Sequence, residues 1–303
     1  MGGSMRIIFG FMAFSILLTA CSRTVTEKDE SDSYSLVAAR WTNAPWLPEV
    51  KAAFTAYDAR NVEDAFQGLD SAWKNGCRDV LVGYRYAFVL DRRGESERAK
   101  MLYLQVSRSL TNEYPDHPYA REVWHNLGHI EYRAGRFEES LSLYRTADRY
   151  AQGTNKEIAF SVGMALRRLK RFSEAIAWFE KADQKDFRTN FYLADVYYEM
   201  KKLDLAMQAM QRAVDADPGS SKALGSLGHY WYALSEQREE ESDFSGAQDA
   251  IRSSLKLYER AISAGGTNYL EYRKAAKARI SDLERLKAVA KTNGLTRVPL
   301  GQE

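Results

Sequence analysis

The chain has 303 residues, of which 45% are hydrophobic and 28% are charged, a composition that excludes an intrinsically disordered protein. Its 43 Lys and Arg residues nearly cancel its 41 Asp and Glu residues, so no strong positive field exists to attract nucleic acid or an anionic membrane surface. Only six residues are proline, and helix-forming residue types dominate after residue 50. We therefore expect an all-α body.

The first 20 residues have the pattern of an export signal. Arg6 is the only charge before an apolar run at residues 7–18 (IIFGFMAFSILL), which two small residues and Cys21 follow. The run is shorter than the roughly 20 residues that a membrane-spanning helix needs. The pattern predicts a signal peptide over residues 1–20, with a buried N-terminal core helix as the alternative.

The sequence LTAC at residues 18–21 resembles the lipobox of bacterial lipoproteins. The resemblance implies that Cys21 is acylated and becomes the first residue of a mature, membrane-anchored protein in the bacterial cell envelope. Ser22 at the next position is similar to lipoproteins sorted to the outer membrane, facing the periplasm. The polar residues that follow predict a flexible tether, so we expect residues 21–34 to form the lipidated cysteine and its tether. Cys77 then has no cysteine with which to form an intramolecular disulfide.

Large and small residues recur at fixed offsets through the rest of the chain. From Ala65 to Ala99 is 34 residues, and from Ser140 to Ala175 is 35. Residues 121–147 (REVWHNLGHIEYRAGRFEESLSLYRTA) carry the pattern most fully. This pattern resembles the tetratricopeptide repeat, a helical hairpin with a period of about 34 residues.

The resemblance implies an all-α fold in which antiparallel helix pairs stack into a right-handed superhelix, an α-solenoid. We expect about six hairpins over residues 35–266, followed by a capping helix and a polar tail over residues 267–303. Small residues are expected where the two helices of a hairpin meet, because a larger side chain there would separate them.

Two irregularities interrupt the period. The connector TNEYPDHPY at residues 111–119 is similar to a phrase that precedes a repeat in envelope-assembly lipoproteins. The stretch EQREEESDFSGAQDA at residues 236–250 is inserted into the last repeat. It predicts either long helices or a protruding loop.

No sequence motif of a catalytic site is present. The chain has no phosphate-binding glycine loop, HExxH, GxSxG or CxxC, so we predict neither an enzyme nor a cofactor. His125 and His129 are four residues apart and therefore share a helical face. Because no second pair of ligands is evident, they are not predicted to bind a metal.

The family resemblance implies that a ligand is held on the concave side, by the first helix of each hairpin. Aromatic residues interleaved with Arg and Asn suit a protein segment, although about half of such residues pack in the core or face water. The predicted groove residues are Tyr84, Arg85, Phe88, His125, Asn126, His129, Arg133, Phe160, Met164, Arg167, Tyr192, Asp195, Tyr198, His229 and Tyr232.

One subtype of the family clamps a C-terminal carboxylate with Lys and Asn on successive first helices. Asn126 matches one clamp position, but Ser161, Tyr192 and Ser226 stand at the equivalent positions downstream. The sequence therefore disfavours this clamp.

The leading hypothesis is an envelope-anchored scaffold that binds a protein or peptide partner during assembly of an envelope complex. One alternative is a ligand-binding or transporter-accessory lipoprotein that encloses a small apolar molecule. Another is a surface adhesin. The sequence does not determine the oligomeric state.

Overall fold

The computed structural model describes residues 27–292, and every regular element in that range is a helix. The predicted signal peptide, Cys21 and the polar tail after residue 292 lie outside the described residues. Within the described range, no helix is both long and apolar enough to span a bilayer. The all-α prediction is confirmed.

The helices, in chain order, are α1 (Glu27–Arg40), α2 (Leu47–Asp58), α3 (Val62–Lys74), α4 (Val80–Arg92), α5 (Ser96–Glu113), α6 (Pro118–Arg133), α7 (Phe137–Tyr150), α8 (Lys156–Arg168), α9 (Phe172–Lys181), α10 (Phe187–Glu199), α11 (Leu203–Ala216), α12 (Ser221–Glu240), α13 (Phe244–Ser263), the 3₁₀ turn η1 (Thr267–Tyr269) and α14 (Leu270–Thr292).

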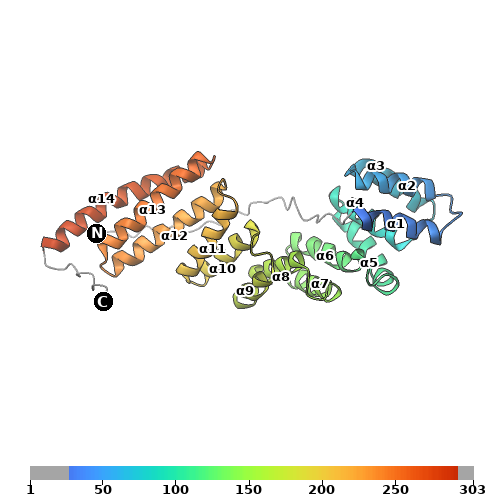
Figure 1. The fold of residues 1–303 in the computed structure, drawn as a ribbon, viewed down its shortest axis with the longest axis horizontal. Helices are drawn as coiled ribbons and strands as arrows, with labels where there is room; N and C mark the ends of the chain where they lie inside the picture. Colours follow the sequence, from blue (N-terminus) through green and yellow to red (C-terminus); the bar gives the residue numbers. More distant parts are fainter. Residues whose placement is uncertain (1–26, 293–303) are drawn as a thin grey trace. The chain divides into compact units, whose positions relative to one another are not determined.

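The helices form two compact units, and the boundary falls within α4, between Val89 and Leu90. Unit 1 contains α1 to α3 and most of α4, and α2 packs against α3. In unit 2 the pairs α6 with α7, α8 with α9, α10 with α11 and α12 with α13 pack together, and each pair contacts the next along the chain (Figure 1). Each unit is thus built from helical hairpins.

The same tight turn ends the first helix of every pair. One residue of each turn has a positive φ, and the next residue's N–H donates to the carbonyl five residues earlier, as Arg136 does to Glu131 at 2.9 Å. This is a common way to end a helix, and glycine tolerates it best. At these six turns the residue with positive φ is Arg60, Gly94, Gly135, Lys170, Lys201 or Ser242. Successive repeats therefore share the same backbone geometry at this turn, even where the residue with positive φ is not glycine.

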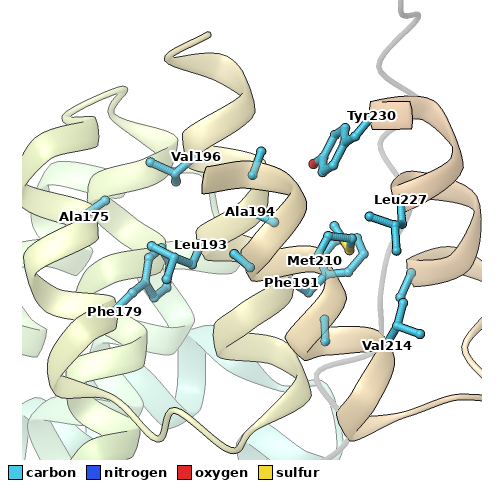
Figure 2. Close-up of a cluster of buried hydrophobic side chains, with 14 of the residues drawn as sticks. Ala175, Phe179, Phe191, Leu193, Ala194, Val196, Met210, Val214, Leu227 and Tyr230 are labelled. Carbon is cyan, nitrogen blue, oxygen red and sulfur yellow. The ribbon is translucent and has the colours of Figure 1, made fainter. Parts of the chain in front are cut away.

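The core of unit 2 forms where large residues of a second helix meet small residues of the first. A Cβ on Gly128 would lie 2.5 Å from the Tyr144 ring, and one on Gly163 would lie 2.8 Å from the Phe179 ring. Figure 2 shows the continuation of this core, in which Phe179 faces α10 and Met210 faces α12. The predicted small-residue contacts are therefore those that hold each hairpin together.

The insertion at residues 236–250 forms long helices and not a loop. Both α12 and α13 are 20 residues long, and only residues 241–243 separate them. Asp243 accepts a hydrogen bond from the N–H of Gly246 at 2.9 Å and so begins α13. The last hairpin is accordingly longer than the others in unit 2.

Helix α1 begins within the segment for which the sequence predicts a flexible tether. Residues 27–40 are helical, and Ser33 and Val37 are fully buried. The two buried residues are four apart and so lie on one face of the helix, and α1 packs on α2. Burial of this face stabilises a helix that the polar composition alone does not indicate.

Helix α14 covers the last hairpin. Ala276, Leu283 and Ala290 recur every seven residues and are buried, and α14 packs on α13. Leu286 and Val289 remain exposed on its other side. The helix thus buries a narrow apolar stripe and leaves a largely charged outer face.

Candidate functional site

In unit 1 the predicted groove residues lie in the core. Arg85 is fully buried, and its guanidinium forms an ion pair with Asp58 at 2.9 Å. It also lies over the rings of Phe54, at 4.0 Å, and Tyr57, at 4.6 Å. Two other groove candidates on α4 pack there too, since Tyr84 is buried and the ring of Phe88 lies 5.4 Å from that of Tyr57. These residues hold α4 against α2.

In unit 2 the two histidines of α6 lie together as predicted. The ring centroids of His125 and His129 are 4.3 Å apart. Nε2 of His125 is 2.9 Å from the Ser161 hydroxyl on α8, and Nδ1 of His129 is 2.8 Å from the Tyr144 hydroxyl on α7. Nε2 of His129 is buried without a hydrogen-bond partner. Nowhere in residues 27–292 do three His, Cys, Asp or Glu side chains converge as metal ligands would.

Burial keeps both imidazoles neutral. It lowers the pKa of His125 to about 4. It also lowers the pKa of His129 well below its usual value, and the nearby His125, Arg133 and Arg188 side chains lower it further. These rings therefore act as neutral hydrogen-bonding groups that link α6 to α7 and α8.

We expect unit 2 to lose stability as the pH falls from 6.5 toward 4. In the unfolded chain His125 titrates near its ordinary pKa of about 6.5, whereas in the folded chain it stays neutral down to about pH 4. Between these values the unfolded state binds more protons, so the free energy of unfolding falls by about 1 kcal/mol per pH unit for this histidine. Above pH 6.5 its contribution is complete.

Denaturant unfolding between pH 7 and pH 5 checks this expectation, with His125→Gln as the comparison. The variant should show a flatter dependence on pH. In addition, the Cε1–H resonance of His125 should not shift between pH 7 and pH 5 in the folded chain. A resonance that titrates near pH 6.5 would contradict the prediction.

The pairing of glycine, histidine and tyrosine occurs twice. Gly228 and His229 on α12 repeat Gly128 and His129, and Nδ1 of His229 is 2.8 Å from the Tyr258 hydroxyl. In the hairpin of α8 and α9, Met164 follows the glycine and Phe179 replaces the tyrosine. The polar histidine–tyrosine pair is thus replaced by an apolar methionine–phenylalanine pair at equivalent positions. The sequence already contained this difference between the repeats.

A cluster of charged and aromatic residues spans α8 and α10. Arg167 forms an ion pair with Asp195, and its guanidinium lies 4.9 Å from the centre of the Tyr192 ring. Arg188 lies over the buried Phe160 ring at 4.8 Å. We call these five residues the central cluster. Because Arg167, Tyr192 and Asp195 are half-buried, the cluster presents hydrogen-bonding groups and part of an aromatic ring to solvent.

The other candidates on α6 and α8 border this cluster or the preceding helix. Met164 is half-buried beside Gly163. The amide of Asn126 donates to the Tyr103 hydroxyl at 3.1 Å. Arg133 is exposed and paired with Asp91. Asn126 and Arg133 therefore already have partners within the chain.

The cap covers the candidates on α12. The ring of His229 lies 4.4 Å from Tyr272 of α14 and 5.9 Å from Tyr269 of η1. Arg279 of α14 lies 5.4 Å from the centre of the Tyr232 ring. Burial lowers the pKa of His229 to about 4. Both groove candidates thus contact the capping segment.

Arg188 and Lys222, which the sequence did not predict as groove residues, each lie over a ring of the preceding first helix. Tyr198 of α10, which was predicted, stacks on Tyr230 of α12 at 4.7 Å and 21°. Lys222, at the start of α12, lies over the Phe191 ring at 4.6 Å. Arg188 belongs to the central cluster. Sequence reasoning missed Arg188 and Lys222 because both stand in the first turn of their helices, and the ring that each covers belongs to the preceding first helix of the stack.

The second helices carry an open depression of about 530 Å³ on α7 and α9. Its lining is mixed and charged, and includes Arg145, Arg149, Arg171, Asp148 and Trp178. Two of its arginines form ion pairs, Arg171 with Glu138 of the lining at 3.9 Å and Arg145 with the neighbouring Glu174 at 3.2 Å. This depression is not the enclosed apolar cavity that a small apolar ligand would need.

Three models of the tetratricopeptide repeat match the chain, over residues 79–147, 125–189 and 187–220. All three describe the same repeat, and none describes an enzyme. A search of curated proteins gives no match.

Solved structures of repeat proteins resemble the chain. The C-terminal part of a TPR repeat-containing protein from Cytophaga hutchinsonii aligns at a TM-score of 0.55 and 15% identity, covering 78% of this chain and 95% of that one. YrrB, described as a TPR protein with an unusual peptide-binding site, aligns at 0.49 and 16% identity, covering 65% and 97%. MamA from Desulfovibrio magneticus RS-1 aligns at 0.48 and 19% identity, covering 60% and 97%.

The family matches agree with the hairpin geometry, in which small residues of one helix receive large residues of the next. Tetratricopeptide repeats therefore occupy residues 79–220 of the chain, and the fold is an α-solenoid of the tetratricopeptide type.

Proposed function

We propose that the chain is a protein-interaction scaffold that holds a segment of a partner protein against the first helices of unit 2. The observation that carries the proposal is the central cluster, which leaves Arg167, Tyr192 and Asp195 half-buried on two successive first helices. Tyr and Arg are the residue types that contribute most to protein interfaces, because each combines a large contact area with hydrogen-bonding groups.

The arrangement suits an extended or helical segment. The aromatic residues of α10 stand on both sides of Asp195, with Phe191 and Tyr192 before it and Tyr198 after it. Tyr192 and Tyr198 are half-buried, so a segment that crosses them can bury apolar area along several residues. Ion pairs hold Arg167 and Arg188 in place, which lowers the entropic cost of binding.

We further propose that Cys21 carries the lipid that anchors this scaffold in the bacterial cell envelope, in the outer membrane facing the periplasm. The support is the apolar run at residues 7–18 followed by LTAC. Attached acyl chains hold a protein at a bilayer by burying their CH₂ groups, each of which contributes about 0.8 kcal/mol. A role in the assembly of an envelope complex is part of the same proposal.

Fractionation of cells tests the anchor. The wild-type chain should be recovered with membranes and should incorporate a labelled fatty acid, whereas Cys21→Ala should do neither. Incorporation of the labelled fatty acid by the variant would contradict the anchor proposal without affecting the scaffold proposal.

Selection from a random dodecamer peptide library tests the scaffold. The full chain, purified in mild detergent, should enrich peptides that bind with micromolar affinity. A variant carrying Tyr192→Ala and Tyr198→Ala should bind the selected peptides at least about tenfold more weakly, because truncation of interface tyrosines commonly costs more than 1 kcal/mol.

The matched control carries Tyr150→Ala and Trp178→Ala, two aromatic residues of the second helices α7 and α9. It should bind as the wild type does. If no peptide is enriched, or if the two double variants bind equally, the first helices are not a protein-binding surface.

A further inference from the structure

We propose that the bound segment carries an acidic side chain, Asp or Glu, which lies between Lys222 of α12 and Arg167 of α8. This inference rests on the proposed function and specifies the chemistry of the partner. Its basis is the balance of charge at the ends of three successive first helices, together with the position of each cation over an aromatic ring.

The three cations of this surface each cover a ring on a neighbouring first helix. Arg188 of α10 lies over Phe160 of α8. In the opposite direction, Arg167 of α8 lies over a ring of α10, that of Tyr192. Lys222 of α12 lies 4.6 Å from the centre of the Phe191 ring, also on α10. These contacts restrict the cations to positions along one surface.

The three cations differ in their carboxylate partners. Arg188 has two, since it donates to both oxygens of Glu157, at 3.2 and 2.9 Å, and to Asp186 at 2.7 Å. Arg167 has Asp195. In the part of the chain that the structure describes, no carboxylate lies within 4 Å of the Lys222 ammonium. Lys222 is therefore the cation whose charge is not neutralised.

Asp195 faces two cations of this surface. Its negative charge acts on both Arg167 and Lys222, but only Arg167 forms the ion pair. Nε of Arg167 is buried and has no hydrogen-bond acceptor. The neighbourhood of Asp195 thus has one positive charge in excess and an unused donor. A carboxylate from a partner would balance the charge and lie beside the two cations.

Lys222 is exposed, but partial desolvation lowers the pKa of its ammonium; Asp195 raises this pKa and Arg167 lowers it. The net direction is downward because Asp195, whose ion pair is with Arg167, does not fully offset the partial desolvation and the repulsion by Arg167. The start of α12 adds the positive end of a helix dipole to the same place. Both effects favour an anionic group at this position.

A side chain within the segment fits better than a free C-terminus. The rings of Phe191 and Tyr192 precede Asp195 on α10, and Tyr198 follows it and stacks on Tyr230. The surface that a partner can cover therefore extends beyond the charged centre in both directions. A chain ending at Lys222 would leave part of it uncovered.

The experiment uses the dodecamers selected on the full chain, synthesised with amidated C-termini and a fluorescent label. Each acidic residue is replaced in turn, Glu by Gln and Asp by Asn, and binding is measured by fluorescence anisotropy. One replacement should weaken binding to the wild-type chain by about tenfold, the loss expected for a hydrogen-bonded charge pair.

The same replacement should have little effect on binding to Lys222→Gln, because the cation that contacts the carboxylate is already removed. Lys181→Gln is the matched control, since Lys181 also lies over an aromatic ring, that of Trp178 at 4.2 Å, but on the second helix α9. It should preserve the wild-type difference between the acidic peptide and its amide analogue. Circular dichroism should show equal helix content in all three chains.

Several results would overturn the inference. If the peptides bind equally well after every acidic residue is replaced, the partner's carboxylate is not required, and the scaffold proposal still stands. If the same dodecamers synthesised with a free C-terminus respond to Lys222→Gln and the amidated forms do not, the source of the carboxylate is the chain end and the inference is wrong. If no dodecamer is selected, the scaffold proposal fails and this inference fails with it.

Discussion

Replacing Arg85 with alanine should lower the free energy of unfolding of unit 1 by about 2–5 kcal/mol, the range for emptied core sites. The side chain is fully buried between Phe54 and Tyr57, so its removal leaves a cavity between α2 and α4. Asp58 also loses its ion pair with Arg85. Most of the loss comes from packing, because Asp58 can still be hydrated at its partly exposed position.

Hydrogen exchange is the appropriate measurement, since it reports the stability of α2 and α3 separately from unit 2. Arg133→Ala serves as the control. Arg133 was also a groove candidate, but its side chain is 43% exposed and its pairing with Asp91 should contribute less than about 1 kcal/mol. Equal effects of the two substitutions would contradict the assignment of Arg85 to the core.

Replacing Tyr144 with alanine should lower the free energy of unfolding of unit 2 by about 3–5 kcal/mol, as for other large aromatic residues in cores. The Tyr144 ring is buried against Gly128, where no Cβ competes for the space. Its hydroxyl contacts Nδ1 of His129 at 2.8 Å. Truncation would thus separate α7 from α6 and leave His129 with both ring nitrogens unpaired.

Tyr144→Phe separates the two contributions. It keeps the ring and removes only the hydroxyl, so the expected loss is about 1–3 kcal/mol, the cost of an unsatisfied buried polar group. Urea unfolding of wild type and both variants, followed by circular dichroism, measures the difference. The prediction fails if the phenylalanine variant is as unstable as the alanine variant, because the ring would then contribute nothing.

The repeat was predictable from the sequence because it is local. Gly128 and Ser140, or Gly163 and Ala175, have spacings that depend only on the helical period and on the length of a turn. His125 and His129 share a face for the same reason. The spacing did not indicate that a buried hydrogen-bond network would enclose this pair.

The predicted groove was harder to derive because exposure depends on neighbours distant in sequence. Arg85 and Arg167 were both groove candidates on first helices, yet Arg85 is covered by α2 and Arg167 is half-buried and reaches solvent. His229 repeats the position of His129 but lies under η1 and α14, at residues 267–292. The periodicity within one helix does not indicate which other helix will cover it in the folded protein.

The sequence by itself determined an all-α solenoid of tetratricopeptide-type hairpins, because large and small residues at a period near 34 can bury themselves only in stacked hairpins. The tertiary structure alone decided that residues 236–250 extend two helices, that Arg85 and His229 are packed away, and that Lys222 comes to lie over Phe191. The physical reason is that helix formation follows local spacing, whereas burial and charge balance depend on contacts between helices far apart in the chain.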